Sequence, residues 1–304
     1  METQDKPLQV VAFGESDIGL VRGNNEDSFL ITDLTHGVAT CASTALDHVV
    51  GEKGILFLVA DGMGGAEAGE VASQMAVEVV SREVFENLTK SQDLNRPGFV
   101  EILKQAIQRA NEVIHEESLC NQKRQGMGTT LTAAAVYDAA IFFAQVGDSR
   151  GYLVRNGAVT QMTRDQSLIA HLVASGAVDH KDARNHPQRN VILQAIGVAK
   201  QVDVAVSYAE LKRNDRAVLC SDGLSGKIDG EELQDVMEKW QEPKEACGQL
   251  ITIARERGGE DNITVIVVKF EGEGLPPPTA EEQPTYQEFK ESKRRGFWPW
   301  SKNQ

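Results

Sequence analysis

Three strand-like segments follow one another closely between Thr130 and Gly157, with no helix between them. They are short, apolar and bounded by Gly, Asp or Asn: Thr130–Tyr137, Ala140–Gly147 and Gly151–Gly157. Connections this short suit antiparallel strands, because a parallel pair needs a crossover of about a dozen residues. The run therefore favours antiparallel sheets with helices outside them over a doubly wound parallel sheet.

The rest of the chain up to about Phe270 mixes further strands with helices. Strands are predicted at Phe29–Asp33, Ile55–Ala60, Val202–Leu211, Arg216–Ser221 and Asn262–Phe270. Helical spacing predicts helices at Gly69–Leu88, Pro97–Ser118, Gly230–Gln241 and Lys244–Arg257. The polar stretch Asp165–Gly197 is predicted to be a helix and an irregular loop inserted between strands.

Bulk properties narrow the function classes. The 304 residues suit one large domain with an appendage. A formal net charge of −14 argues against a nucleic-acid partner. The four cysteines form no C-x-x-C pair, the start of the chain does not resemble a signal peptide, and no apolar run reaches the roughly 18 residues of a membrane helix. We therefore expect a cytoplasmic protein without a transmembrane segment, with free and mostly buried thiols.

The stretch "ILFLVADGMGGAEAGE" has the strand, glycine turn and helix of a nucleotide-binding loop. The dinucleotide pattern G-x-G-x-x-G fails at Glu67, where the third glycine should stand. The P-loop pattern fails at Glu70, which occupies the position of the lysine. A carboxylate there would repel phosphate, so this turn is not expected to bind an anion by itself.

Acidic residues recur beside the predicted strands. Three follow a strand (Asp61, Asp148 and Asp222) and three precede one (Glu26, Asp27 and Asp261). A single Asp-Gly after a strand signals only a turn. In an antiparallel sheet, however, the end of one strand lies beside the start of its neighbour. We therefore expect five segments to bring carboxylates to one rim.

Clustered carboxylates at low dielectric need a counter-charge. All-oxygen ligands point to Mg²⁺ or Mn²⁺, and the chain contains no EF-hand calcium loop. Gly62 is expected to turn the chain sharply after Asp61 and to direct its carbonyl at the same ion, while Gly64 and Gly65 let the backbone pass close to the site.

Eight sequence blocks, in this order, match a known family. They are "GLVRGNNEDS", "ADGMGGAEAGEVAS", "GMGTTLTAA", "QVGDSRGYL", "MTRDQSL", "ARNHPQRNVILQAIG", "CSDGLSG" and "GGEDNITVIVV". Over roughly Val10 to Phe270 the chain resembles the bacterial branch of the metal-dependent serine/threonine protein phosphatases, the protein phosphatase 2C (PPM-type) family.

The resemblance implies an α+β fold, an α-β-β-α sandwich of two antiparallel sheets flanked by helices. The catalytic domain would span residues 8–271, with an inserted flap at about 165–197. Residues 272–304 would form a Pro-rich linker and a basic, aromatic tail, which we expect to be disordered or to dock a partner protein or an anionic membrane surface.

The resemblance also implies a site with two Mn²⁺ or Mg²⁺ ions and, in bacterial members, often a third. The implied roles are a bridging ligand (Asp61), a carbonyl ligand of the first ion (Gly62), ligands of the second (Asp222, Asp261), acids that hold metal-bound water (Glu26, Asp27), a third-ion ligand with Asp222 (Asp148) and the phosphate-binding arginine (Arg22). In this family a water between the ions attacks phosphorus directly, without a phospho-enzyme.

The implied function is removal of phosphate from phosphoserine and phosphothreonine in proteins, opposing bacterial Ser/Thr kinases, by an enzyme expected to be a monomer. Two positions depart from relatives. Met63 replaces the histidine of many eukaryotic members, which leaves the general acid unassigned, and Gln166 replaces the histidine common in the bacterial flap. The alternatives are a phosphatase-fold regulator of a single partner phosphoprotein and a catalytically silent phosphoprotein-binding module.

Overall fold

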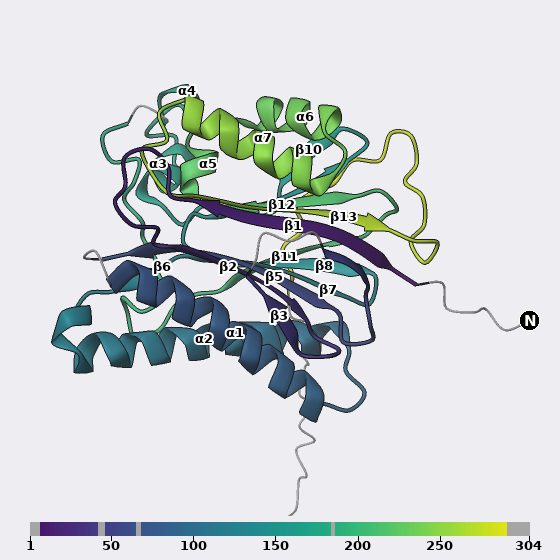
Figure 1. The fold of residues 1–304 in the computed structure, drawn as a ribbon, viewed down its shortest axis with the longest axis horizontal. Helices are drawn as coiled ribbons and strands as arrows, with labels where there is room; N and C mark the ends of the chain where they lie inside the picture. The colour runs from purple at the N-terminus through teal and green to yellow at the C-terminus, as the bar shows by residue number, and fades with distance from the viewer. Residues whose placement is uncertain (1–6, 42–45, 65–67, 184–185, 291–304) are drawn as a thin grey trace, which may run out of the picture.

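The computed structural model describes residues 7–41, 46–64, 68–183 and 186–290. It shows two antiparallel sheets packed face to face, with helices on both outer surfaces (Figure 1). The α-β-β-α sandwich inferred from the resemblance is therefore confirmed.

The first sheet has the strand order β10-β9-β12-β13-β1-β4. Its strands are β1 (Gln9–Asp17), β4 (Leu46–Val49), β9 (Arg150–Arg155), β10 (Ala158–Gln161), β12 (Arg216–Cys220) and β13 (Ile263–Glu271). The sequence analysis missed β1, whose apolar alternation is interrupted by Gly14 and ends in Glu15, Ser16 and Asp17. Gly14 is needed here because a Cβ would lie 2.5 Å from the Phe29 ring of the facing sheet.

The second sheet has the order β11-β8-β7-β5-β2-β3, and β6 pairs with the end of β5. Its strands are β2 (Asp27–Asp33), β3 (Val38–Thr40), β5 (Ile55–Met63), β6 (Gly128–Thr129), β7 (Leu131–Tyr137), β8 (Ala140–Val146) and β11 (Ala205–Glu210). Of the three consecutive segments predicted from sequence, β7 and β8 pair here, whereas β9 belongs to the first sheet. The chain changes sheets at Gly147, whose φ of 104° favours glycine.

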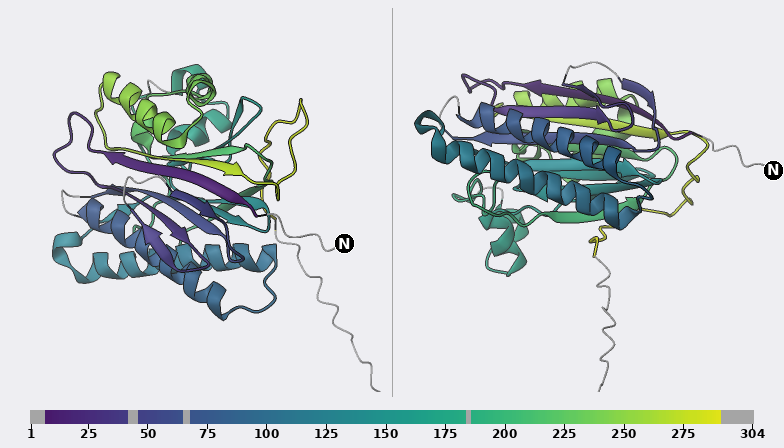
Figure 2. Two further views of the ribbon diagram at one scale, coloured as in Figure 1. Left: turned by 45° about the vertical axis from the view of Figure 1, so that its right-hand side comes forward. Right: turned by 90° about the horizontal axis from the view of Figure 1, so that it is seen from below.

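Helices cover each outer surface (Figure 2). The buried apolar side chains accordingly form three clusters, one between the sheets and one under each helical layer. α1 (Ala68–Lys90) and α2 (Arg96–Cys120) pack on the second sheet, and α6 (Gly230–Lys239) and α7 (Pro243–Glu256) pack on the first. These four helices match the predicted ones closely. The remaining helices are short: η1 (Gln122–Arg124), α3 (Leu168–Ala174), α4 (His180–Ala183) and α5 (Asp222–Ser225).

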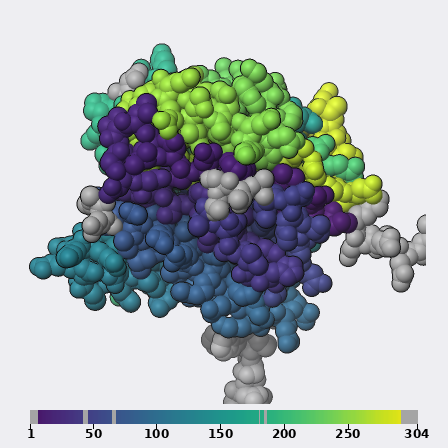
Figure 3. All heavy atoms as spheres, in the orientation of Figure 1, coloured from purple at the N-terminus to yellow at the C-terminus, as the bar shows by residue number. Residues whose placement is uncertain are grey.

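Residues 272–290 differ from the expected disordered linker, because they lie along the domain (yellow, at the right-hand margin in Figure 3). The backbone around Phe289 pairs with β11: Tyr208 donates to the Gln287 carbonyl at 2.9 Å, and Phe289 donates to the Val206 carbonyl at 2.8 Å. The Phe289 ring contacts Phe142 and Tyr208 edge-on. The prolines suggested a linker, but the aromatic residues that follow supply the burial that orders the segment. Most of the basic, aromatic tail falls in residues 291–304, outside the described residues.

Two bulk expectations can be compared with the structure. No helix in the described ranges combines the length and apolarity needed to cross a bilayer. All four cysteines are free; Cys220 and Cys247 are buried, but Cys41 and Cys120 are exposed, so the thiols are not mostly buried.

Candidate metal centre and phosphate site

Asp27 and Asp61 are cross-strand partners at the same end of β2 and β5. Directly opposite residues of an antiparallel pair point to the same face. Phe29 and Val59, two residues further along each strand, belong to the core between the sheets. The two carboxylates therefore continue the row of side chains that faces the other sheet, and Asp27 is buried.

The predicted turn at Gly62 is wrong, because β5 continues through Gly62 to Met63 and pairs there with β6. The turn comes at Gly64, with a φ of 138°. Gly62 is required for close packing instead: a Cβ would lie 2.2 Å from the Gly69 carbonyl oxygen and 2.5 Å from that of Glu26. Its amide donates to the Glu26 carbonyl at 3.1 Å.

The facing sheet brings further carboxylates to this end, on the left in Figure 1. Asp222 begins α5 directly after β12, and Asp261 precedes the paired strand β13. Asp148 lies on the connection from β8 to β9, where the chain changes sheets. Burial first, and then the charges of Asp27, Asp222, Asp148 and Asp261, raise the pKa of Asp61 well above its usual value. The acids expected at one rim thus share one electrostatic environment.

The neighbouring acids respond in the same way. Burial raises the pKa of Asp27 to about 7 against the hydrogen bond from Ser221, whose Oγ donates to Asp27 Oδ2 at 2.7 Å. Burial and then the charge of Asp222 raise the pKa of Asp148 to about 7. Burial and then the charge of Asp261 raise that of Asp222.

We refer to the end of the sandwich that carries Asp27, Asp61, Asp148, Asp222 and Asp261 as the acidic end. Its chemistry fits hard cations. Asp27 Oδ1 is buried without a hydrogen-bond partner, and the surrounding donor set consists of carboxylate oxygens. Bound Mg²⁺ or Mn²⁺ would supply the counter-charge that these groups lack. Within the described ranges, no three of these acids bring their oxygens within 4.8 Å of one another.

Asn262, which the sequence analysis did not single out, holds the loop that carries Arg22 and Glu26. Its Oδ1 accepts the Glu26 amide at 2.8 Å. Its Nδ2 donates to the carbonyls of Ile18 and Asn24, each at 3.0 Å. The only sequence signal was its place at the start of a predicted strand, directly after Asp261. Glu26 itself is partly exposed, and burial raises its pKa.

Arg22 lies at the open rim of the acidic end. Its Nη2 donates to Asp261 Oδ2 at 2.8 Å, and about half of the side chain, 49%, is exposed. The hydrogen bond to Asp261 raises the pKa of Arg22, with smaller contributions from Glu26 and Asp61. The positively charged guanidinium of Arg22 therefore lies beside the carboxylates, and its outer side is open to solvent.

The start of the flap is tied to the Asp148 connection. Asp165 accepts two guanidinium nitrogens of Arg150, with Nη2 at 2.6 Å. Gln166 Oε1 accepts the amide of Gly147 at 2.8 Å, and Ser167 caps α3. Gln166, the departure from the bacterial pattern, thus holds the turn directly before Asp148.

Comparisons with known proteins agree with this geometry. A family model described as protein phosphatase 2C matches residues 43–256. The serine/threonine phosphatase stp of Listeria welshimeri is 38% identical over 214 residues, covering 70% of this chain and 84% of that protein. The crystal structure of the Mycobacterium tuberculosis serine/threonine phosphatase PstP/Ppp is 34% identical, with a TM-score of 0.71, over 86% of this chain and 99% of that one.

A further structure contains metal. The catalytic domain of the serine/threonine protein phosphatase PstP, solved in complex with two manganese ions, is 31% identical with a TM-score of 0.70, over 87% of this chain and 99% of that one. An α-β-β-α sandwich with carboxylates gathered at one end is the scaffold of a metal-dependent phosphatase. This chain belongs to the protein phosphatase 2C family, as its sequence blocks predicted.

Proposed function

We propose that this protein hydrolyses phosphoserine and phosphothreonine in proteins, opposing bacterial Ser/Thr kinases, with Mn²⁺ or Mg²⁺ at its acidic end. One observation carries the proposal. The cross-strand pair Asp27 and Asp61 shares a buried environment with Asp148, Asp222 and Asp261, beside a half-exposed arginine.

The proposed roles follow the positions of the acids. Asp61 would be the ligand common to two ions, the Gly62 carbonyl would serve the first, and Asp222 and Asp261 would hold the second. Glu26 and Asp27 would orient metal-bound water, and Asp148 with Asp222 could hold a third ion. When bound, such ions lower the pKa of water to near neutrality and neutralise charge on the phosphoryl group.

Arg22 orients the substrate phosphate. Its guanidinium can offer two parallel N–H groups to two phosphate oxygens, a geometry that a lysine lacks. In this structure one of its nitrogens is engaged by Asp261. Binding of a cation by Asp261 would release that nitrogen toward the substrate, so occupation of the metal site and readiness for phosphate are linked.

Direct displacement by water is supported by the state of the two nearby serines. Ser221 is buried, donates to Asp27 and accepts the Thr264 amide at 3.0 Å. Ser149 is buried and shares a hydrogen bond of 2.7 Å with Thr130. Both hydroxyls are shielded from solvent, so neither is presented to a substrate, which supports a mechanism without a phospho-enzyme.

The finer assignments belong to the same proposal. Residues 8–271 form the catalytic domain, with the flap at about 165–197. The protein acts as a monomer in the cytoplasm, and residues 291–304 dock a partner protein or an anionic membrane surface. The family members named above are phosphatases, which favours an enzyme over a regulator of a single partner.

The test is hydrolysis of p-nitrophenyl phosphate and a phosphothreonine peptide with Mn²⁺, with and without EDTA. Asp61→Asn should lose most of the activity, because it would remove the ligand proposed to be shared by both ions. Asp235→Asn, an exposed aspartate on α6, is the matched control and should retain wild-type rates. Turnover in EDTA, or an active Asp61→Asn enzyme, would refute the mechanism.

A further inference from the structure

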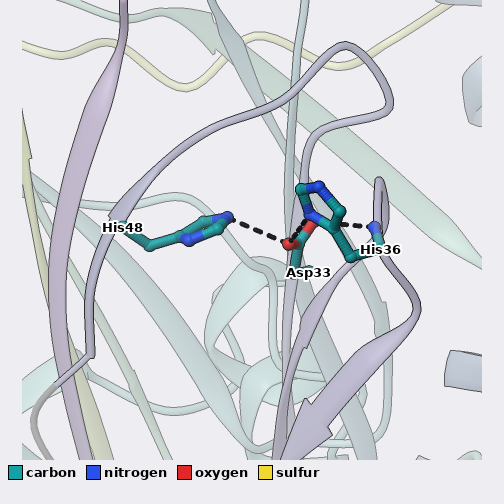
Figure 4. Close-up of side chains that lie close together, drawn as sticks. All are labelled: Asp33, His36 and His48. Carbon is teal, nitrogen blue, oxygen red and sulfur yellow. Dashed lines mark hydrogen bonds and ion pairs between the residues drawn. The ribbon is translucent and has the colours of Figure 1, made fainter.

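A second group of metal-ligating side chains lies at the other end of β2. Asp33 Oδ2 is 2.5 Å from Nδ1 of His36 and 3.0 Å from Nε2 of His48 (Figure 4). Within the described ranges, this is the only group in which three His, Cys, Asp or Glu ligand atoms all lie within 4.8 Å of one another. We refer to Asp33, His36 and His48 as the His-Asp cluster.

The His-Asp cluster is separate from the acidic end. β2 runs from Asp27 to Asp33, and at about 3.4 Å per residue its ends are about 20 Å apart. Phe29 and Ile31, on the same face of the strand, fill the space between them with buried apolar side chains. An ion at the cluster would therefore be independent of those used in catalysis.

The cluster joins the two sheets. Asp33 ends β2 in the second sheet, and His36 lies in the turn that follows. His48 is on β4, the edge strand of the first sheet, which pairs with β1. A bond between His48 and Asp33 would thus connect the sheets where the chain passes from one to the other.

The carboxylate is already oriented toward the two imidazoles. Asp33 is buried, and its Oδ1 accepts the amides of Thr35 at 2.8 Å and His36 at 3.3 Å. Oδ2 is left to face both rings. Burial raises the pKa of Asp33, but the hydrogen bonds from His36 and from these amides outweigh it and lower the pKa overall, so the ligand oxygen is anionic at neutral pH.

His48 supplies an independent indication of a missing ligand. Its Nε2 is shielded from solvent, and although it lies 3.0 Å from Asp33 Oδ2, the angles do not satisfy a hydrogen bond. The distance alone therefore overstates this contact. A buried imidazole nitrogen that makes no hydrogen bond costs free energy, and a metal ion held between His48 and Asp33 would use its lone pair.

We propose that the His-Asp cluster is a structural Zn²⁺ site that fastens the two sheets together. Two imidazoles and one carboxylate suit Zn²⁺, whereas Mg²⁺ and Mn²⁺ prefer oxygen ligands. Zinc–ligand distances of about 2.0 Å place tetrahedral ligands about 3.3 Å apart. The present separations of 2.5 and 3.0 Å need to widen by less than 1 Å, and His36, whose side chain is 64% exposed, is free to move. Water would take the fourth position.

The test uses the full chain saturated with Mn²⁺, so that zinc is measured while the acidic end is occupied. Zinc retained after dialysis is counted by elemental analysis, and its effect on the melting temperature is recorded. The wild type should retain one more zinc per chain than His36→Ala or His48→Ala, and zinc should raise the melting temperature only in the wild type. Cobalt in place of zinc should give the visible absorption of a tetrahedral site in the wild type alone.

Two features of this design keep the outcome decisive. His36→Ala removes an exposed side chain, so it tests the ligand without loss of packing even if His48→Ala folds poorly. His171→Ala, which removes another exposed imidazole, is the matched control and should retain the zinc. Equal zinc content in the wild type and His36→Ala, or no zinc in the wild type, would overturn the proposal whether or not the protein is a phosphatase.

Discussion

Asp27 lies directly opposite Asp61 in the register of β2 and β5, so two carboxylates occupy the closest positions that neighbouring strands offer. Like charges at such positions destabilise a sheet. Burial raises the cost further, and the pKa values of both groups rise in response. The strand pair is therefore built at the expense of its own stability at the end where cations are proposed to bind.

The metal-free protein should lose stability as the pH rises. Folding raises the pKa of Asp27 from its usual 3.8 to about 7. Its contribution to the free energy of unfolding is therefore fully present below pH 3.8, falls as the pH rises, and is lost once the pH has passed about 7. Urea unfolding in EDTA should give a lower midpoint at pH 8 than at pH 6. Asp27→Asn should weaken this dependence, and Mn²⁺ should restore the midpoint at pH 8 because it binds the ionised acids. An identical pH dependence in Asp27→Asn would contradict the argument.

Substitution of Arg22 should separate phosphate binding from metal binding. Arg22→Ala should lower kcat/KM by about 10- to 100-fold, the range expected for loss of a charged hydrogen bond. The kcat/KM of Arg22→Lys should lie between those of the wild type and Arg22→Ala, because lysine keeps the charge and loses the planar pair of N–H groups. Steady-state kinetics on a phosphothreonine peptide check this, with Arg109→Ala, an exposed arginine on α2, as the control. Affinity for Mn²⁺ should not fall, since Asp261 is released rather than removed.

The buried ion pair between Arg155 and Asp215 should be a stability determinant with no part in catalysis. Arg155 donates Nε and Nη2 to the two oxygens of Asp215 at 2.8 and 2.7 Å, and both side chains are buried. Asp215→Asn should cost about 3 kcal/mol of unfolding free energy, because it removes the two-oxygen partner of a buried guanidinium, which keeps only Glu282 at 3.1 Å as a counter-charge. Glu112→Gln, which breaks the exposed pair with Arg109, should cost less than about 1 kcal/mol. Equal effects of the two variants on urea unfolding would show that the inner pair is not isolated from water.

Two truncations should behave differently. Removal of residues 291–304 should leave the melting temperature unchanged, since it keeps the backbone pairing of Gln287 and Phe289 with β11 and the ring contacts of Phe289. Removal of residues 272–304 should lower it by several degrees, because it uncovers Phe142 and Tyr208 and strips the backbone partners of β11. Thermal unfolding measures both. Docking to liposomes or partner proteins should be tested with the shorter truncation, whose loss of binding cannot be ascribed to a damaged sheet.

The sequence predicted most of what local chemistry controls. The order of the acids beside strands led to a common rim, and the spacing of apolar residues located all four long helices. β1 was missed because Gly14 serves contact with Phe29 across the core, a reason that is not local. The placement of β9 in the other sheet depends on pairing with β12, which lies far along the chain.

Other features of the molecule escaped prediction for similar reasons. Asn262 acts through carbonyls more than 200 positions away, and nothing in its neighbours indicates those partners. The order of residues 272–290 follows from aromatic side chains that fit against β8 and β11, whereas their prolines alone resemble a spacer. The His-Asp cluster joins residues of two sheets and has no recognisable spacing motif.

The side chain of Asn262 has a consequence for how a substrate is received. One amide group both accepts from and donates to the loop before β2, and it follows directly on Asp261, which faces Arg22. An aspartate at this position could not donate, and a leucine could do neither. The backbone that carries the arginine is thereby joined to the residue that follows the acid opposite it. A phosphorylated substrate would bind a loop whose backbone is already ordered, so less conformational entropy would be lost on binding.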